Sequence, residues 1–328
     1  MTSTYKNNNG TAEQATNQTM EPVRPDLSAP DPANPFYFPD FAIPTGLELN
    51  GYQVMKCPVR DDPLTQVQEV QSLTMREDDV IITAYPKCGT HWVAEILYML
   101  TSGQTASYGK TKEYNMLEFC DDLTAVDNLP SPRVLNSHLV MAHLPQDLVD
   151  KRVKLVHLIR NSKDTAVSLY HHMKQSATEK FTFDNFLKGY SCNKYNGYHH
   201  QFFYLRQMAE FEKSHPGHPI MHIHYEDLKE DPASIIKTLS EFVNHPASDD
   251  FCQKVASACS FTNMKKADDT RGLPEKLQEA IKKRLNFYRK GVVGDWKSQF
   301  NVAQNEMFDQ FLAEQRQKGF GFKPRGEF

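Results

Sequence analysis

The sequence lacks the features that mark membrane, secreted and nucleic-acid-binding proteins. No apolar run reaches the roughly 20 residues that a membrane-spanning helix needs. The opening residues, MTSTYKN, lack the apolar core of a signal peptide. The net charge of -4 is not the basic excess typical of nucleic-acid-binding domains. These absences predict a cytoplasmic protein without membrane or nucleic-acid partners.

Metal and disulfide patterns are also missing. The six cysteines show no Cys-x-x-Cys spacing, so free thiols in a reducing compartment are expected. His222 and His224 alternate along one segment, but no third residue has a spacing suited to a metal ligand. The sequence therefore predicts no metal site.

Composition divides the chain into two parts. Residues 1–45 are polar and then rich in proline, which predicts a disordered or extended tail because such a segment buries too little apolar surface. The length of 328 residues fits one large α/β domain or two small ones. From residue 46 the chain alternates between apolar strands and amphipathic helices, so we expect one domain over residues 46–328.

Four segments read as strands, and helical patterns separate them: 80–83, 133–138, 153–160 and 220–225. This alternation predicts a central parallel sheet flanked by helices on both faces. In such sheets ligands bind at the carboxyl ends of the strands. Four residues of chemical interest fall at or just past a strand end: Lys87, His138, Arg160 and Tyr225.

The segment Tyr85–Trp92 reads YPKCGTHW and joins the first strand to an amphipathic helix. A strand, a tight loop with lysine and glycine, and then a helix form a P-loop-like phosphate-binding arrangement, because the helix start supplies free N–H donors. The loop is not a Walker A motif, since Lys87 precedes Gly89 and no Lys-Ser/Thr pair follows. An ordinary strand-to-helix turn is the alternative for this loop alone.

Two further basic segments suggest anion binding. Arg160 begins RNSKDTAVS, in which Ser168 is placed to reach the same anion, while a surface salt bridge with Asp164 is the alternative. Residues 289–297 read RKGVVGDWK, which is either an anion-binding loop or a solvated charged turn. Three such sites predict a ligand with several anionic groups, such as a nucleotide phosphorylated at two positions. No cluster of carboxylates suggests a magnesium site.

In that order and spacing the three segments resemble those of the cytosolic sulfotransferases, from about residue 46 to the carboxyl end. The resemblance includes Tyr225–Asp227 and Val302–Glu306. It implies transfer of a sulfuryl group from the co-substrate 3′-phosphoadenosine 5′-phosphosulfate (PAPS) to a hydroxyl group of a small alcohol or phenol.

The resemblance also implies roles for individual residues. His138, which by itself is either a general base or a structural histidine, matches the catalytic base, and Lys87 would stabilise charge on the bridging oxygen. Positions matching those that bind the donor are Lys87, Cys88, Gly89, Thr90, His91, Trp92, Arg160, Ser168, Tyr225, Cys259, Ser260, Phe261, Met264, Arg289, Lys290 and Gly291. Positions matching the acceptor side are Met116, Asn136, Ser137, His138 and His172.

Several residues depart from the family pattern. Cys88 stands where serine is common; backbone N–H groups do the binding there, so we expect activity to survive. Asn136 stands where many members carry lysine, which predicts a slower enzyme or a different cation. His172 replaces a common aromatic residue and favours an alcohol or small phenol over a flat steroid. Lys297–Glu306 resembles the dimerisation motif, with Asn301 in place of threonine, so a homodimer is expected there.

Two other functions are compatible with the residues. An atypical nucleotide kinase would require magnesium, for which the sequence offers no Walker pair. A module that binds the nucleotide or an apolar ligand without turnover is favoured by Asn136, whereas Lys87 and His138 argue against it.

Overall fold

The computed structural model describes residues 47–49, 52–54, 59, 62–120, 122–175, 177, 181–191, 200–281, 285–319 and 321–326. The predicted tail over residues 1–45 lies outside these residues, as do Cys57 and Cys192. The cysteines that the structure describes are buried free thiols, as predicted: Cys88, Cys120, Cys252 and Cys259.

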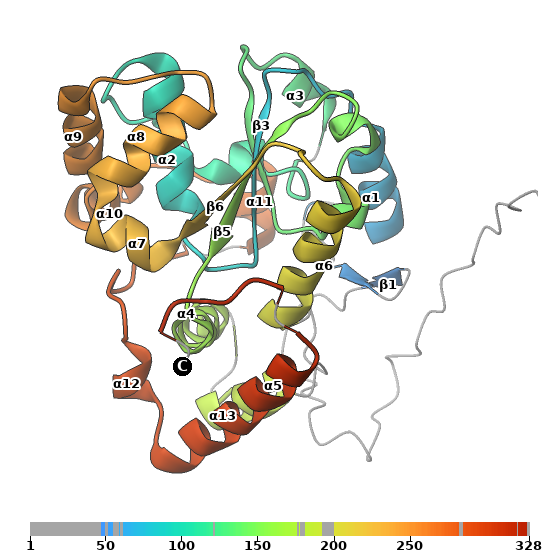
Figure 1. Ribbon diagram of the computed structural model, residues 1–328, viewed down its shortest axis with the longest axis vertical. Coiled ribbons are helices and arrows are strands. Elements are labelled where there is room, and N and C mark those ends of the chain that lie inside the picture. Colours follow the sequence, from blue (N-terminus) through green and yellow to red (C-terminus); the bar gives the residue numbers. More distant parts are fainter. Residues whose placement is uncertain are drawn as a thin grey trace, which may run out of the picture.

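A four-stranded parallel sheet forms the centre of the molecule, in the order β4-β3-β5-β6 (Figure 1). Its strands are β3 (Val80–Ala84), β4 (Val134–Ser137), β5 (Lys154–Ile159) and β6 (Ile220–His224), which confirms the predicted strands and the fold class. After β3 the chain forms β4 on one side, then crosses to form β5 on the other. Ligands of open parallel sheets bind at such a reversal, outside the carboxyl ends of the strands.

Helices cover both faces of the sheet because successive strand residues point to opposite sides. Val80 and Ile82 face one core, to which α2 (Thr90–Ser102), α8 (Pro232–Phe242) and α9 (Asp249–Ala258) contribute. Ile81 faces a second core, with side chains of α1 (Pro63–Ser72) and α6 (Gln201–Ser214). Figure 1 shows these two groups of helices on opposite sides of β3 and β5.

The remaining elements follow the order of the chain: β1 (Leu47–Leu49), β2 (Tyr52–Val54), η1 (Lys112–Asn115), α3 (Thr124–Asp127), η2 (Met141–His143), η3 (Gln146–Leu148), α4 (Ser162–Lys174), α5 (Phe183–Ser191), α7 (Tyr225–Glu230), α10 (Phe261–Asp268), α11 (Glu275–Ile281), α12 (Trp296–Gln299) and α13 (Val302–Gln317). In the described part of the chain, no helix has both the length and the apolar character to cross a membrane.

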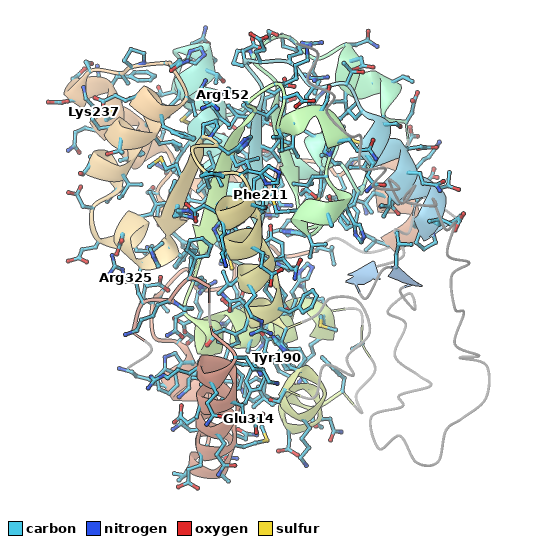
Figure 2. The ribbon with its side chains drawn as sticks, turned by 45° about the vertical axis from the view of Figure 1, so that its right-hand side comes forward. Arg152, Tyr190, Phe211, Lys237, Glu314 and Arg325 are labelled. Carbon is cyan, nitrogen blue, oxygen red and sulfur yellow. The ribbon has the colours of Figure 1, made fainter. Side chains whose placement is uncertain are left out.

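Aromatic side chains join α5 and α13 to the rest of the core. Tyr190 of α5, labelled in Figure 2, has its ring centroid 5.7 Å from that of Phe186 and 6.1 Å from that of Phe308 on α13. Its hydroxyl accepts a hydrogen bond from the backbone N–H of Gln201, where α6 begins. Tyr190 thereby connects three helices through one fully buried side chain.

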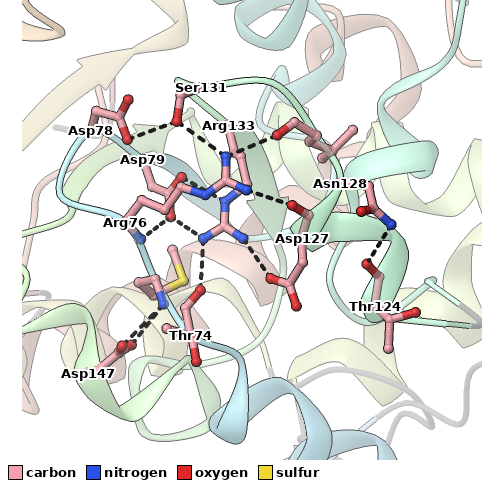
Figure 3. A network of polar contacts seen from close by, with 12 residues as sticks. Thr74, Arg76, Asp78, Asp79, Thr124, Asp127, Asn128, Ser131, Arg133 and Asp147 are labelled. Carbon is pink, nitrogen blue, oxygen red and sulfur yellow. Dashed lines mark hydrogen bonds and ion pairs between the residues drawn. The ribbon is translucent and has the colours of Figure 1, made fainter.

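A buried ion pair joins the amino ends of β3 and β4, at the end of the sheet opposite the candidate site (Figure 3). The Arg133 guanidinium donates to both carboxylate oxygens of Asp79, at 2.8 and 2.5 Å. It also donates to the backbone carbonyl of Thr74 and to the Asp127 carboxylate. These bonds satisfy a charged side chain of which only 1% is exposed.

Candidate active site

The loop between β3 and α2 adopts a conformation that few sequences allow. Gly89, at the N-cap of α2, has φ of 106°, and a Cβ atom there would lie 3.0 Å from the Tyr225 ring. Lys87 also has a positive φ, 72°. No side chain caps α2, so the N–H donors of its first turn are directed at the loop with the positive end of the helix dipole. This geometry leaves backbone N–H donors at the positive end of the helix dipole, a setting that favours an anion.

Lys87 is held within this loop by its backbone. The Arg160 guanidinium donates to the Lys87 carbonyl at 2.9 Å, and the Lys87 Nζ atom lies 5.8 Å from the centroid of the Phe287 ring. Burial, and then the nearby charge of Lys112, lower the pKa of Lys87 to about 8. Binding of an anion would restore the ordinary charge preference of this ammonium.

Cys88 points away from the loop and into the core. Its Sγ atom lies 3.9 Å from Nε2 of Gln201, whose side chain also donates to the Arg160 carbonyl at 2.7 Å. Burial raises the pKa of the thiol to about 12, so Cys88 is neutral at physiological pH. Cys88, which stands where the similar sulfotransferases commonly carry serine, therefore packs in the core and does not face the loop.

Aromatic and basic side chains gather beside Gly89. The Arg160 guanidinium lies 4.3 Å from the centroid of the Tyr225 ring, and the Trp92 and Tyr225 rings meet edge to face at 5.8 Å. Lys229 lies 5.6 Å from the Trp92 ring centroid. The structure thus brings together Trp92, Arg160 and Tyr225, which the sequence placed on three separate segments.

The basic segment 289–297 is anchored onto α4. The Asp164 carboxylate accepts hydrogen bonds from the backbone N–H groups of Gly294, at 2.6 Å, and Trp296, at 3.0 Å, rather than the predicted alternative of a salt bridge with Arg160. Asp295 pairs with both Arg289 and Lys290, and these partners lower its pKa to about 2, although burial acts to raise it. The segment is an ordered turn in which one carboxylate pairs with two cations, which leaves an excess of positive charge.

The α9–α10 connection reaches the same basic segment. Gly291 has φ of 65° and packs directly under the Phe261 ring, with no room for a side chain. Cys259 and Ser260 join α9 to α10, and Met264 is buried in α10. Ser168 lies half-buried on α4, the helix that anchors the basic segment. The positions predicted to bind PAPS on α4 and on the α9–α10 connection therefore lie on elements that each contact the basic segment.

His138 follows the last residue of β4 and is held by two contacts. Its Nδ1 atom lies 2.7 Å from the Ala84 carbonyl oxygen, and its backbone N–H donates to the Glu118 carboxylate at 2.6 Å. A carbonyl oxygen only accepts, so Nδ1 carries the proton and the lone pair of the ring lies on Nε2. Burial, and then the charge of Lys112, hold the pKa of His138 well below its usual range. The neutral imidazole is a competent proton acceptor.

Polar side chains from three other elements lie near His138 and Lys87. Lys112 of η1 donates to the Asn136 Oδ1 atom at 3.1 Å and lies 3.4 Å from the Glu113 carboxylate. That carboxylate also lies 3.1 Å from His91 Nε2 on α2. Met116 forms an isolated β-bridge with Asn136, which fixes η1 against β4, and Ser137 is fully buried beside them.

His172 approaches the same region from α4. Its ring stacks with that of Phe287 at a centroid distance of 6.0 Å, and Phe287 also packs on His91 at 4.3 Å. Burial, and then the charge of Lys87, hold the pKa of His172 well below its usual range. His172 thus lies close enough to Lys87 to feel its charge, while Met116 and Asn136 are in contact with Lys112.

Sequence reasoning missed five residues of this site: Lys112, Glu113, Glu118, Gln201 and Phe287. Lys112 and Glu113 lie in a charged stretch that reads as solvent-exposed, yet each is only 4% exposed. Glu118 lies two residues after Met116, a predicted acceptor-side position, so its place in the sequence was a usable signal. Among the residues that the structure describes, no group of His, Cys, Asp and Glu is arranged to hold a metal ion.

Comparison with known proteins relates this geometry to one family. The sulfotransferase domain model matches residues 77–320. The chain is 31% identical to mouse sulfotransferase 1A1 over 276 residues, covering 78% of this chain and 92% of that protein, and 32% identical to the dog enzyme of the same name over 273 residues, covering 79% and 90%. The crystal structure of mouse sulfotransferase SULT7A1 complexed with PAP matches with a TM-score of 0.65 at 26% identity, covering 83% of this chain and 94% of that one.

Proposed function

Because the chain belongs to the sulfotransferase family, we propose that it transfers the sulfuryl group of PAPS to a hydroxyl group of a small alcohol or phenol. As a PAPS-dependent sulfotransferase it has two substrates to position, the nucleotide donor and the acceptor. The observation that carries the proposal is the position of Lys87 and His138 just past the carboxyl ends of the paired strands β3 and β4, with the lone pair of His138 on Nε2.

The donor is bound along the loop and the two basic segments. The backbone N–H groups of residues 89–91, at the start of α2, bind the 5′-phosphosulfate, while the Trp92 and Tyr225 side chains contact the adenine. Arg160, Ser168 and the turn Arg289–Gly291 bind the 3′-phosphate. Asp295 keeps Arg289 and Lys290 in place beside α4 until the phosphate arrives.

The transfer is an in-line displacement at sulfur. The acceptor oxygen attacks the sulfur atom while His138 Nε2 takes the hydroxyl proton. The bond between sulfur and the bridging phosphate oxygen breaks, and Lys87 stabilises the negative charge that this oxygen gains. The products are the sulfated acceptor and 3′,5′-adenosine bisphosphate, and His138 releases its proton to solvent.

The acceptor side favours a hydroxyl compound with limited flat aromatic surface. Of the residues predicted on the acceptor side, Asn136, Ser137 and His172 are polar, and Met116 is a flexible apolar side chain. A large apolar ring that binds among polar groups leaves them without hydrogen-bond partners, and this makes binding less favourable. We therefore propose an alcohol or a small phenol over a steroid.

The test is incubation of the purified protein with PAPS and a panel of alcohols, phenols and steroids without magnesium. We expect release of 3′,5′-adenosine bisphosphate together with a sulfated alcohol or phenol, both detected by mass spectrometry. A chain that binds the bisphosphate in a thermal-shift assay but turns over none of the acceptors would instead be a nucleotide-binding module. A requirement for magnesium would favour a kinase.

We also propose a homodimer through Lys297–Glu306 in the cytoplasm. Val302, at the start of α13, leaves 76% of its surface exposed, against 46% for Val292 and 49% for Val293, the other exposed large apolar side chains of the described residues. The buried free thiols support a reducing compartment. Light scattering should give twice the monomer mass, and Val302→Glu should give the monomer mass with unchanged secondary structure. A monomeric wild-type protein would contradict the dimer.

A further inference from the structure

We propose that Lys112 is a second catalytic cation, which contacts the sulfuryl group during transfer, and that Asn136 positions it. The inference rests on the proposed sulfuryl transfer. It concerns a lysine of η1, far in sequence from the three segments that resemble the family. Lys112 would be the different cation that the departure at Asn136 requires.

The side chain of Asn136 holds Lys112 at two points. Its Oδ1 atom accepts from the Lys112 ammonium at 3.1 Å, and its Nδ2 group donates to the Lys112 backbone carbonyl at 2.8 Å. Asn136 lies on β4 two residues before His138. His138 follows β4 directly, and Lys112 is the charge that acts most on its imidazole, so the ammonium that Asn136 holds lies near the base.

The ammonium of Lys112 is buried with one weakly satisfied proton. Its strong partners are Asn136 and the Glu113 carboxylate at 3.4 Å, and its third contact is the Met116 sulfur at 3.2 Å. A thioether sulfur is a weak acceptor, and the Glu113 carboxylate is shared with His91. Burying a charge on these terms is costly, so a stronger acceptor is expected to complete the site. A sulfuryl oxygen supplies that acceptor.

The charges around Lys87 also favour the binding of an anionic group beside Lys112. Lys112 and Arg160 lower the pKa of Lys87 after burial, whereas Glu113 and Asp268 raise it. The cations of this group outnumber its carboxylates, and an anionic group from the donor would balance them. Lys112 is also the charge that acts most on His138, which supports its place on the acceptor side.

The two lysines have different tasks in the transfer. Lys87 acts on the bridging oxygen, where the S–O bond breaks. Lys112 donates a hydrogen bond to an oxygen of the sulfuryl group as that group moves from the phosphate oxygen to the acceptor oxygen. It remains protonated throughout and forms no covalent bond, so the proton released by the acceptor still goes to His138.

The primary test is Lys112→Met, which keeps an unbranched side chain one atom shorter and removes the charge. We expect kcat to fall about 10²–10³-fold, the usual loss when a positioned donor to a reacting oxygen is removed. The affinity for 3′,5′-adenosine bisphosphate, measured by calorimetry, should be unchanged because this product lacks the sulfuryl group. Lys110→Met is the matched control: Lys110 is exposed, over the ring of Tyr114 at 5.0 Å, and its loss should leave both quantities unchanged.

A charge-transposed variant separates catalysis from folding. Lys112→Asn combined with Asn136→Lys exchanges the amide and the ammonium between η1 and β4, and it should restore most of the kcat lost in Lys112→Met. If Lys112→Met keeps the wild-type kcat, the inference is wrong. It is also wrong if Lys112→Met lowers bisphosphate affinity and melting temperature together and the exchange restores nothing. A wild-type protein without turnover would instead contradict the proposed function itself.

Discussion

The environment of His138 determines its chemistry more than its residue type does. A histidine in solution titrates near neutral pH and exchanges its proton between both ring nitrogens. Here the Ala84 carbonyl selects the tautomer and Glu118 fixes the backbone. Both contacts come from residues beside the reacting end of the sheet, so the side chain is oriented before any substrate binds.

Replacing His138 by alanine should affect turnover and spare nucleotide binding. We expect kcat for His138→Ala to fall about 10²–10⁴-fold, the range of general base catalysis. The affinity for 3′,5′-adenosine bisphosphate should stay at the wild-type value, because the proposed mechanism places the imidazole against the acceptor and not against the nucleotide. Steady-state kinetics and calorimetry measure the two quantities, and near-normal turnover would remove the role of His138.

The pH dependence of kcat/KM for PAPS should report the ionisation of His138 and of Lys87 in the free enzyme. His138 is needed neutral and its pKa is well below the ordinary value, so activity should persist at pH 6.5 and fall only in more acidic solution. Lys87 is needed charged and its pKa is about 8, so activity should fall as the pH rises through about 8.

Lys87→Arg tests the assignment of the alkaline side. The guanidinium stays protonated throughout, so the fall near pH 8 should disappear even if the rate is lower. An aliphatic alcohol is the acceptor of choice, since it does not ionise in this range. An alkaline fall that is the same in Lys87→Arg would show that another group causes it.

At the scale of single elements, the β3–α2 loop depends on one glycine. Gly89 combines a left-handed backbone with the close approach of the Tyr225 ring, so Gly89→Ala meets both backbone strain and a side-chain contact. Strain of this kind costs about 1–3 kcal/mol. We expect affinity for 3′,5′-adenosine bisphosphate to fall about tenfold or more, measured by calorimetry.

Gly103 provides the matched control at the other end of the same helix. It caps α2 with φ of 67°, and a Cβ atom there would meet nothing within 4 Å. Gly103→Ala should lower stability through its backbone while leaving bisphosphate affinity unchanged. Equal losses of affinity in both variants would mean that the loop geometry is not what binds the nucleotide.

At the scale of the whole molecule, the two ends of the sheet have different tasks. The carboxyl ends of the strands carry the site, and the amino ends of β3 and β4 are joined by Arg133 and Asp79. Replacing Arg133 leaves Asp79 as a buried charge without its partner. Breaking a buried pair in this way costs about 3–5 kcal/mol.

We therefore expect Arg133→Met to lower the free energy of unfolding in urea by about 3–5 kcal/mol. The folded fraction should keep its bisphosphate affinity, because the pair lies at the amino ends of the strands and the site at their carboxyl ends. Lys254→Met, which removes an exposed pair with Asp250 on α9, should leave the free energy of unfolding nearly unchanged. A similar small effect for Arg133→Met would show that Asp79 is satisfied without it.

The alternation of apolar strands and amphipathic helices along the sequence determined the parallel sheet. Helices bury both faces of such a sheet, so its strands are apolar throughout and each helix has one apolar face, and both patterns are visible in the sequence. Spacing also located the three loops, since glycine and helix starts constrain the backbone locally. Lys112, Glu113 and Phe287 were decided only by the tertiary structure. Their polarity or apolarity says nothing about which strand end they reach, and burial next to Lys87 and Asn136 arises only when segments distant in the sequence pack together.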